Sequence, residues 1–366
     1  IADKLRALDV SFIDIEDVNE EGLLRCADDV QPVIDKFLAA KVDALFIPHC
    51  NFGSEHSCAK VARALNVPTL LWGPRDEAPL ADGSVLVVEI PRGTLSRVGP
   101  DGTVSVVAEC GGGPNGSAIG PDGAVWITNN GGCFEWIDVG GILVPGGVPD
   151  EWHGGCIQRV DLTDGSVETV YTHCGDLRLR APNDLVFDGH GGFWFTDHGV
   201  RQGRTSDRTG VYYALADGSS ITEVLFPLDA PNGIGLSPDG DRLYVAETHT
   251  GRVWSWRVPE PGVAVGGGVL PPHGDLLAGL PGLQLLDSLA VDAEGHVCVG
   301  TLQHGGITVI SPDGGTVEHV PIDDVLVTNI AFGGPDLRTA FVTASGTGRL
   351  LALDWPRPGL APPHVA

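Results

Sequence analysis

Apolar and polar positions alternate along most of this chain, and turn residues interrupt the alternation at intervals. One pattern recurs: an apolar strand, a tight turn rich in Asp and Gly, and a second strand of β-branched or aromatic residues, which is typical of a β-hairpin. Its five copies are PNGSAIGPDGAVWIT (114–128), PNDLVFDGHGGFWFT (182–196), PNGIGLSPDGDRLYVA (231–246), LDSLAVDAEGHVCVGT (286–301) and the weaker TNIAFGGPDLRTAFVT (328–343). Recurrence of this kind predicts a repeat architecture built from sheets.

Further Asp-Gly turns lie between these copies, so each unit carries about two hairpins. They are Asp101-Gly102, Asp164-Gly165, Asp217-Gly218 and Asp313-Gly314. Four strands per unit, at a period of roughly 40 to 66 residues, predict a propeller blade. Adding the strand DGSVLVVEI at 82–90 gives six units. We therefore expect a mainly β fold, a six-bladed β-propeller over residues 80–356, followed by a tail at 357–366.

The first part of the chain follows a different pattern. Apolar residues recur at helical spacing at Val30, Val33, Ile34, Phe37 and Leu38. Residues 43–48 and 67–72 are predicted as buried strands, with a second helix from about residue 54 to residue 65. This succession predicts a short parallel α/β segment over residues 1–79, too short for a full doubly wound domain.

One polar residue occupies the same register in four of the repeats. Asn115, Asn183, Asn232 and Asp287 each lie eight residues before the Gly of the following turn. In a radial β architecture, this register places one polar side chain per repeat at the same height near the central axis. Such a ring predicts a metal site. The alternative is that these residues satisfy the inner-strand backbone or solvate a channel, and Asn115 is equally compatible with channel lining and with substrate contact.

Composition limits the choice of partners. The chain has 52 Gly, 27 Pro and a formal net charge of −26. A surface this acidic repels nucleic acid and anionic membranes, so we expect neither as a partner. No apolar run approaches the roughly 20 residues of a membrane span, and the N-terminus lacks the features of a signal peptide. We expect a cytoplasmic protein, and because Met is absent even at position 1, a sequence that is not a complete reading frame.

Cysteines and histidines give weaker signals. Eight Cys without any C-x-x-C pair predict reduced thiols. The spacing of His49, Cys50, His56 and Cys58 fits no common zinc site. His198 and His249 follow the ends of second strands, where propeller loops surround the channel mouth. They are either surface residues or substrate contacts.

Two stretches near the N-terminus carry a resemblance to a known family. HCNFGSEHS (49–57) and LLWGPRDEAPLADGS (70–84) resemble the N-terminal region of the fucose/arabinose-type ketol isomerases. In that family the catalytic carboxylates and histidine lie in later domains, which this chain lacks. A sugar isomerase is therefore the least favoured function.

From Asp82 onward the chain resembles the senescence marker protein/gluconolactonase (regucalcin-like) family. The PNG, PND, PNG and DS blade starts and GGITVISPDG (305–314) carry this resemblance. It implies a six-bladed propeller that hydrolyses a small-molecule sugar lactone with one divalent cation, commonly Ca²⁺, with Zn²⁺ or Mn²⁺ as alternatives. By this resemblance Asn232 and Asp287 match metal ligands, and Asn183 matches an asparagine beside the metal that helps to hold substrate.

The residue types suit this chemistry. A hard cation held by oxygen ligands polarises a lactone carbonyl and lowers the pKa of a water. Asp287 is the candidate anionic ligand and general base. Arg180, three residues before Asn183, is a candidate to bind a substrate hydroxyl or the developing oxyanion.

The sequence departs from the family in the first blade. Eight residues before Gly83 lies Arg75, where the family has a metal-binding Glu. Glu77 would face the same side of a strand and is a candidate substitute ligand. The two resemblances meet at LADGS (80–84), so the chain looks like a fusion, with an impaired site and lower stability as expected consequences. A catalytically silent propeller that binds a sugar-like ligand or a protein is therefore the alternative to a lactone hydrolase. The oligomeric state stays open.

Overall fold

The computed structural model describes residues 27–43, 45–48, 60–61, 63–65, 69–72 and 82–364, together with residues 13, 15 and 18. The chain divides into two compact units, Ile1–Arg75 and Asp76–Ala366. Among the described residues, no helix combines the length and the apolar character needed to cross a membrane.

The first unit contains a helix and two parallel strands. Helix α2 (Ala27–Ala40) buries Val30, Val33, Ile34 and Phe37 on one face. Strand β1 (Leu45–Pro48) pairs in parallel with β2 (Thr69–Trp72), and residues 60–61 and 63–65 are helical. The predicted α/β character is confirmed. Leu38 differs from the expectation, because its side chain is 54% exposed and lies outside the buried face of the helix.

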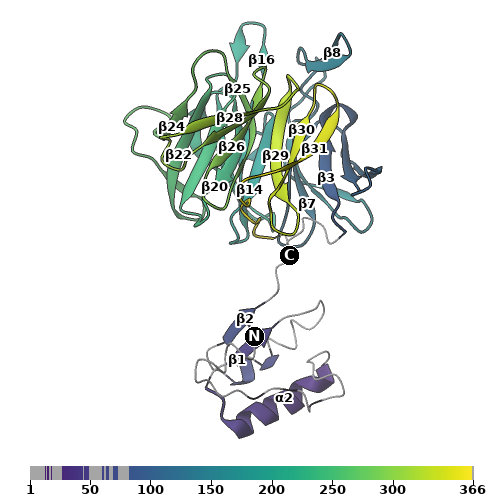
Figure 1. Ribbon diagram of the computed structural model, residues 1–366, viewed down its shortest axis with the longest axis vertical. Helices are drawn as coiled ribbons and strands as arrows, with labels where there is room; N and C mark the ends of the chain where they lie inside the picture. The colour runs from purple at the N-terminus through teal and green to yellow at the C-terminus, as the bar shows by residue number, and fades with distance from the viewer. Residues whose placement is uncertain are drawn as a thin grey trace. The chain divides into compact units, whose positions relative to one another are not determined.

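The second unit contains six antiparallel sheets of three or more strands, numbered here as blades 1 to 6 in chain order (Figure 1). Blade 1 contains β3 (Val85–Glu89), β4 (Thr94–Val98) and β5 (Val104–Glu109), with the 3₁₀ turn η1 (Ile90–Arg92) between β3 and β4. Blade 2 contains β6 (Pro114–Ile119), β7 (Val125–Asn129), β10 (Cys156–Val160) and β11 (Val167–Tyr171). Blade 3 contains β14 (Pro182–Phe187), β15 (Gly192–Asp197), β18 (Thr209–Leu215) and β19 (Ile221–Leu228).

Blade 4 contains β20 (Pro231–Leu236), β21 (Arg242–Glu247) and β22 (Arg252–Glu260), and the outer edge of β22 pairs with both β23 (Val263–Val265) and β24 (Asp275–Gly279). Blade 5 contains β25 (Leu285–Val291), β26 (Val297–Leu302), β27 (Gly306–Ile310) and β28 (Val317–Pro321). Blade 6 contains β29 (Val327–Gly333), β30 (Thr339–Ala344) and β31 (Arg349–Asp354). Within the described residues, blades 1 and 6 thus have three strands each.

The first strands of successive blades contact one another around the axis. Strand β14 contacts β6 and β20, β20 contacts β25, and β25 contacts β29. The predicted six-bladed β-propeller is therefore confirmed.

Both faces of each central blade are covered by its neighbours, which explains the unbroken burial of GFWFTD in β15. Between blades 2 and 3, the ring of Trp126 lies 5.3 Å from that of Phe193 and 6.1 Å from that of Phe187. These aromatic contacts place Trp126 in the packing between blades 2 and 3. The core lies between the sheets, so each blade is held by its neighbours.

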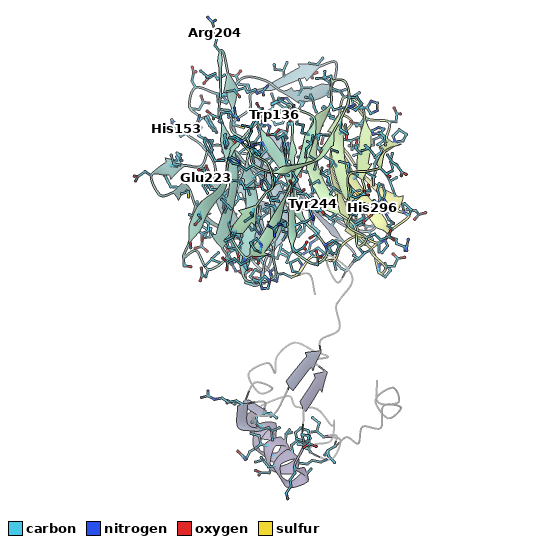
Figure 2. The ribbon with its side chains drawn as sticks, turned by 90° about the vertical axis from the view of Figure 1, so that its left-hand side faces the viewer. Trp136, His153, Arg204, Glu223, Tyr244 and His296 are labelled. Atoms are coloured by element: carbon cyan, nitrogen blue, oxygen red, sulfur yellow. The ribbon has the colours of Figure 1, made fainter. Side chains whose placement is uncertain are left out.

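Short hairpins are inserted at one end of the propeller. They are β8 (Trp136–Val139) with β9 (Ile142–Pro145), β12 (His173–Cys174) with β13 (Leu177–Arg178), and β16 (Arg201–Gln202) with β17 (Thr205–Ser206). Figure 1 shows β8 and β16 at the same end of the unit, and Figure 2 shows Arg204 projecting beyond the body of the propeller. Because the first strand of each blade starts at this end, we refer to it as the mouth.

The C-terminal segment packs against blade 5. The guanidinium of Arg357 forms an ion pair of 2.5 Å with the fully buried carboxylate of Asp292. The backbone N–H of Leu360 donates to the carbonyl of Val291 at 3.1 Å. Residues 357–364 are thereby anchored to the propeller.

Candidate cation and substrate site

A β-bulge recurs at the polar position of the first strand in each of blades 2 to 6. The ladder with the second strand shifts register at Pro114/Gly116, Pro182/Leu185, Pro231/Ile234, Leu286/Leu289 and Val327/Asn329. A bulge takes a residue out of the ladder and changes the direction of its side chain. Asn115, Asn183, Asn232, Asp287 and Thr328 occupy these bulges, so their shared register is a structural feature of the mouth.

Glycine after the polar residue lets neighbouring first strands approach closely. A Cβ at Gly116 would lie 2.6 Å from the carbonyl oxygen of Asn183. A Cβ at Gly233 would lie 2.6 Å from the backbone nitrogen of Leu289 and 2.7 Å from the carbonyl oxygen of Asp287. Backbone atoms cannot move aside as a flexible side chain can, so the PNG segments bring the polar residues of adjacent blades together.

Threonines on the second strands fix the backbone of the next blade. The hydroxyl of Thr128 in blade 2 donates to the carbonyl of Asn183 at 2.6 Å. The hydroxyl of Thr196 in blade 3 donates to the carbonyl of Asn232 at 2.6 Å. Both bonds are buried, and each connects the second strand of one blade to the candidate ligand of the following blade.

The last residue of the second strand in blades 2, 3 and 4 accepts hydrogen bonds from the loop that leads into the first strand of the same blade. Asn129 accepts the N–H of Gly113 at 2.9 Å, and Glu247 accepts the N–H of Asp229 at 2.8 Å. The carboxylate of Asp197 accepts the N–H groups of Arg180 and Ala181 at 2.6 and 2.7 Å. These caps hold the segments that carry Asn115, Asn183 and Asn232 in place. These caps were not predicted from the sequence, although the segments WITN, WFTD and YVAE each end in a polar residue.

Two amide oxygens in this register are buried without a partner. Among the described residues, Oδ1 of Asn183 and Oδ1 of Asn232 have no hydrogen-bond donor. The amide nitrogen of Asn232 is fixed by donation to the hydroxyl of Thr248 at 3.1 Å. Leaving a buried acceptor unsatisfied costs about 1–3 kcal/mol, so these oxygens are suited to receive a ligand.

Asp287 adds a carboxyl group from blade 5. Its Oδ1 accepts the N–H of Ser288 at 3.0 Å. Burial raises the pKa of Asp287 to about 7, against the opposing effects of the Asn232 side chain and the Ser288 N–H. The residue keeps part of its surface open to solvent, although protein surrounds the carboxyl group. A nearby positive charge would stabilise the carboxylate form.

A second carboxyl group, Asp184, was not singled out from the sequence. Burial raises its pKa to about 7, and the charge of Asp287 acts in the same direction. The N–H groups of Leu185 and Ile234 and the side chain of Ser288 oppose this shift. Asp184 therefore extends from blade 3 to the first strands of blades 4 and 5. The PND segment was the available signal, since Asp replaces the Gly of the PNG segments at this position.

These residues provide the oxygen donors that a hard cation prefers. Asn183, Asn232 and Asp287 contribute two amide oxygens and one carboxylate, so the donor set fits the predicted type of cation. Within the described part of the chain, no three His, Cys, Asp or Glu side chains form a group that could hold a metal ion. The candidate site therefore depends on the amides. Arg75 and Glu77 lie outside the described residues, so the predictions for both stay predictions.

Arg180 lies at the mouth, on the segment that enters β14. Its Nε donates to Asp207 at 2.9 Å, and its guanidinium lies 4.5 Å from the centre of the Trp152 ring. The side chain remains 41% exposed. These contacts hold the guanidinium while leaving part of it accessible. Its role toward substrate stays a prediction.

The fold and this site define a class: six-bladed propellers with an oxygen-lined site at one end of the axis. Residues 76–346 match the family model of the SMP-30/gluconolactonase/LRE-like region, and the chain belongs to this family. Residues 1–84 match the N-terminal domain of fucose/sulfoquinovose isomerases. The two matches overlap at 76–84, where the sequence analysis placed the junction.

Several similar proteins are named as lactonases. The chain is similar to the gluconolactonase of Zymomonas mobilis, with 27% identity over 250 residues, which cover 64% of this chain and 61% of that protein. It is also similar to the lactonase drp35 of Staphylococcus haemolyticus, with 31% identity over 147 residues, or 40% of this chain and 41% of that protein. The chain thus spans less than two thirds of the length of either relative.

Solved structures support the fold. A gluconolactonase from Xanthomonas campestris superposes with a TM-score of 0.59 at 23% identity, covering 75% of this chain and 83% of that one. Regucalcin from Agrobacterium tumefaciens, described as a calcium-binding protein, gives a TM-score of 0.58 at 18% identity, covering 77% and 88%. At these identities the likeness shows the propeller fold alone.

Proposed function

We propose that this protein hydrolyses a small sugar lactone at the mouth of the propeller. The reaction uses one divalent cation, for which Ca²⁺ is the first candidate. The observation that carries the proposal is the position of two partnerless amide oxygens, Asn183 Oδ1 and Asn232 Oδ1, in the same register as Asp287. Membership of the family and the lactonase names of its relatives support the same reaction.

Three residues would hold the cation: Asn183, Asn232 and Asp287, with Glu77 as a further candidate. When bound, a divalent cation supplies polarisation of the lactone carbonyl and acidifies a water molecule. Neutral amides contribute oxygen atoms without adding negative charge, so a cation held by them keeps its Lewis acidity. Regucalcin is described as calcium-binding, which supports the choice of Ca²⁺.

Asp287 is the proposed general base. Its Oδ1 accepts the Ser288 N–H, which orients the carboxylate, and the carboxylate would accept a proton from the attacking water. The water oxygen bonds to the carbonyl carbon, the ring C–O bond then breaks, and Asp287 returns its proton to the departing alkoxide. The products are a hydroxyl group and a carboxylic acid, which releases its proton to solvent and becomes a carboxylate. Arg180, held by Asp207, would donate to a substrate hydroxyl or to the oxyanion at the mouth.

A catalytically silent propeller that binds a sugar-like ligand or a protein remains the second candidate. The observation that favours it is Arg75, at the position where the family resemblance places a metal-binding Glu. A guanidinium beside the site would oppose a cation by charge repulsion.

The test is hydrolysis of glucono-δ-lactone by the purified full chain, with and without added Ca²⁺, Zn²⁺ or Mn²⁺, above the spontaneous rate in the same buffer. The same assay is run on an Arg75→Glu variant. We expect cation-dependent turnover by the unaltered chain and faster turnover by the variant. Turnover by the variant alone would show a lactonase scaffold disabled at its junction. Absence of turnover in both would favour the silent propeller.

A further inference from the structure

Four polar side chains form a cluster at the mouth between blades 3 and 4. The rings of His198 and His249 meet edge to face, with their centres 5.7 Å apart. Arg201 and Asp229 form an ion pair of 2.9 Å, and both act electrostatically on the two histidines. We refer to His198, His249, Arg201 and Asp229 as the mouth cluster.

The mouth cluster is connected to the candidate cation ligands on both sides. The backbone N–H of His198 donates to the carbonyl of Ala181 at 3.0 Å, two residues before Asn183. His249 directly follows Thr248, whose hydroxyl accepts the amide of Asn232 at 3.1 Å. A molecule whose reacting carbonyl lies near the two amide oxygens would therefore have this cluster beside it.

The mouth cluster offers hydrogen-bonding groups but little net charge. Nδ1 of His198 lies 3.0 Å from the carbonyl oxygen of Gly199. A carbonyl only accepts, so Nδ1 carries the hydrogen and Nε2 remains an acceptor. Burial lowers the pKa of His198 and lowers that of His249 to about 4, which keeps both rings neutral at pH 7.

Arg201 and Asp229 cancel each other's charge and remain accessible. Their side chains are 47% and 34% exposed. The pair presents guanidinium donors and a carboxylate acceptor at the mouth. Donors and acceptors side by side can bind hydroxyl groups, since each hydroxyl donates one hydrogen bond and accepts others. An anionic substituent would have to compete with Asp229 for Arg201.

We propose that the mouth cluster binds the hydroxyl groups of a neutral, polyhydroxylated lactone and determines substrate specificity. This inference rests on the proposed lactonase function and names the substrate features that the same site selects. His249 contacts the hydroxyls, and His198 positions its ring. A site built to hydrogen-bond a hydroxyl discriminates strongly against an analogue that lacks it, because its own polar groups then remain unpaired.

The test compares glucono-δ-lactone with δ-valerolactone, which has the same ring and no hydroxyls, as substrates of the full chain with Ca²⁺. The His249→Phe variant keeps the ring contact with His198 but removes hydrogen bonding. The specificity ratio is kcat/KM for glucono-δ-lactone divided by kcat/KM for δ-valerolactone. In His249→Phe we expect this ratio to fall about tenfold or more, because KM for glucono-δ-lactone rises. His249→Gln restores part of the ratio. His304→Phe alters a different histidine pair, 4.3 Å between ring centres, and leaves the ratio unchanged.

An equal fall for both lactones in His249→Phe, or an unchanged ratio, would overturn the proposal. Preference of the unaltered chain for 6-phosphogluconolactone would overturn the selection of a neutral substrate. If the unaltered chain hydrolyses neither lactone, the proposed function fails, and calorimetric binding of gluconolactam, a hydrolysis-resistant neutral analogue, decides the inference alone. Binding that is weakened at least tenfold by His249→Phe would support it, and equal or absent binding would reject it.

Discussion

Removal of divalent cations should make the stability of the propeller depend on pH in an unusual direction. The pKa of Asp287 is raised from 3.8 to about 7 by burial. Between these values the unfolded chain carries the ionised carboxylate, while the folded protein retains the proton. The contribution of this group to stability is therefore full below pH 4 and is lost as pH rises toward 7.

The magnitude follows from the size of the shift. A difference of about 3 pKa units corresponds to about 4 kcal/mol, at 1.36 kcal/mol per unit. If Ca²⁺ binds as proposed, it would reverse the effect, because it would stabilise the carboxylate and satisfy the amide oxygens of Asn183 and Asn232. Other carboxyls, such as Asp324 with its Thr347 and backbone partners, have a lowered pKa and contribute in the opposite sense. Their contribution changes mainly below pH 4. Between pH 5 and pH 8, Asp184, whose pKa is also raised to about 7, adds to the effect of Asp287, and His198 and His249, whose pKa values are lowered, oppose it below pH 6.5. The contribution of Asp287 is therefore the difference between the unaltered chain and Asp287→Asn.

Urea unfolding followed by tryptophan fluorescence is a suitable assay, since seven of the eight Trp lie in the propeller. In the presence of a chelator, we expect the unaltered chain to lose about 2–3 kcal/mol more than Asp287→Asn between pH 5 and pH 8, because about 2 of the 3 pKa units lie above pH 5. Asp101→Asn, at an exposed turn, should keep the pH dependence of the unaltered chain. The same pH dependence in Asp287→Asn as in the unaltered chain would refute the reasoning.

Two further predictions concern packing. Gly233→Ala should destabilise the propeller by about 1–3 kcal/mol and weaken Ca²⁺ binding, because its Cβ meets the backbone of blade 5. Gly279→Ala, with only a side-chain atom at 3.9 Å, is the control, and equal urea midpoints for both variants would contradict the close approach of the strands. Arg357→Leu should cost about 1.5–3 kcal/mol in urea unfolding, because it removes the guanidinium partner of the buried carboxylate of Asp292, which keeps the backbone N–H groups of Glu294 and His296. A loss below 1 kcal/mol would show that the C-terminal segment contributes little.

The blades were predictable because their signals are local. Alternation of side chains and an Asp-Gly turn specify a hairpin from about 15 residues of sequence. The equal spacing from Asn183 to Gly191 and from Asn232 to Gly240 also predicts that the two Asn residues occupy the same position in their blades. Both features depend on the geometry of a single hairpin.

Other features depend on contacts between blades, and the sequence predicts them only weakly. The bulges arise where first strands of adjacent blades pack, and Asp184 becomes part of the site only because blades 4 and 5 surround it. The ring contact between His198 and His249 joins loops of two blades. The hairpin β16–β17 lies between the second and third strands of blade 3, and no repeat or turn pattern predicted it.

The most direct test of the account is Ca²⁺-dependent hydrolysis of glucono-δ-lactone by the full chain, compared with Asp287→Asn and Asn232→Ala in one experiment. We predict turnover above the spontaneous rate that requires Ca²⁺, falls at least a hundredfold in Asp287→Asn, and needs higher Ca²⁺ for half-maximal rate in Asn232→Ala. Turnover that persists with a chelator, or that is unaffected by both substitutions, would contradict the central claim that these residues form the active site.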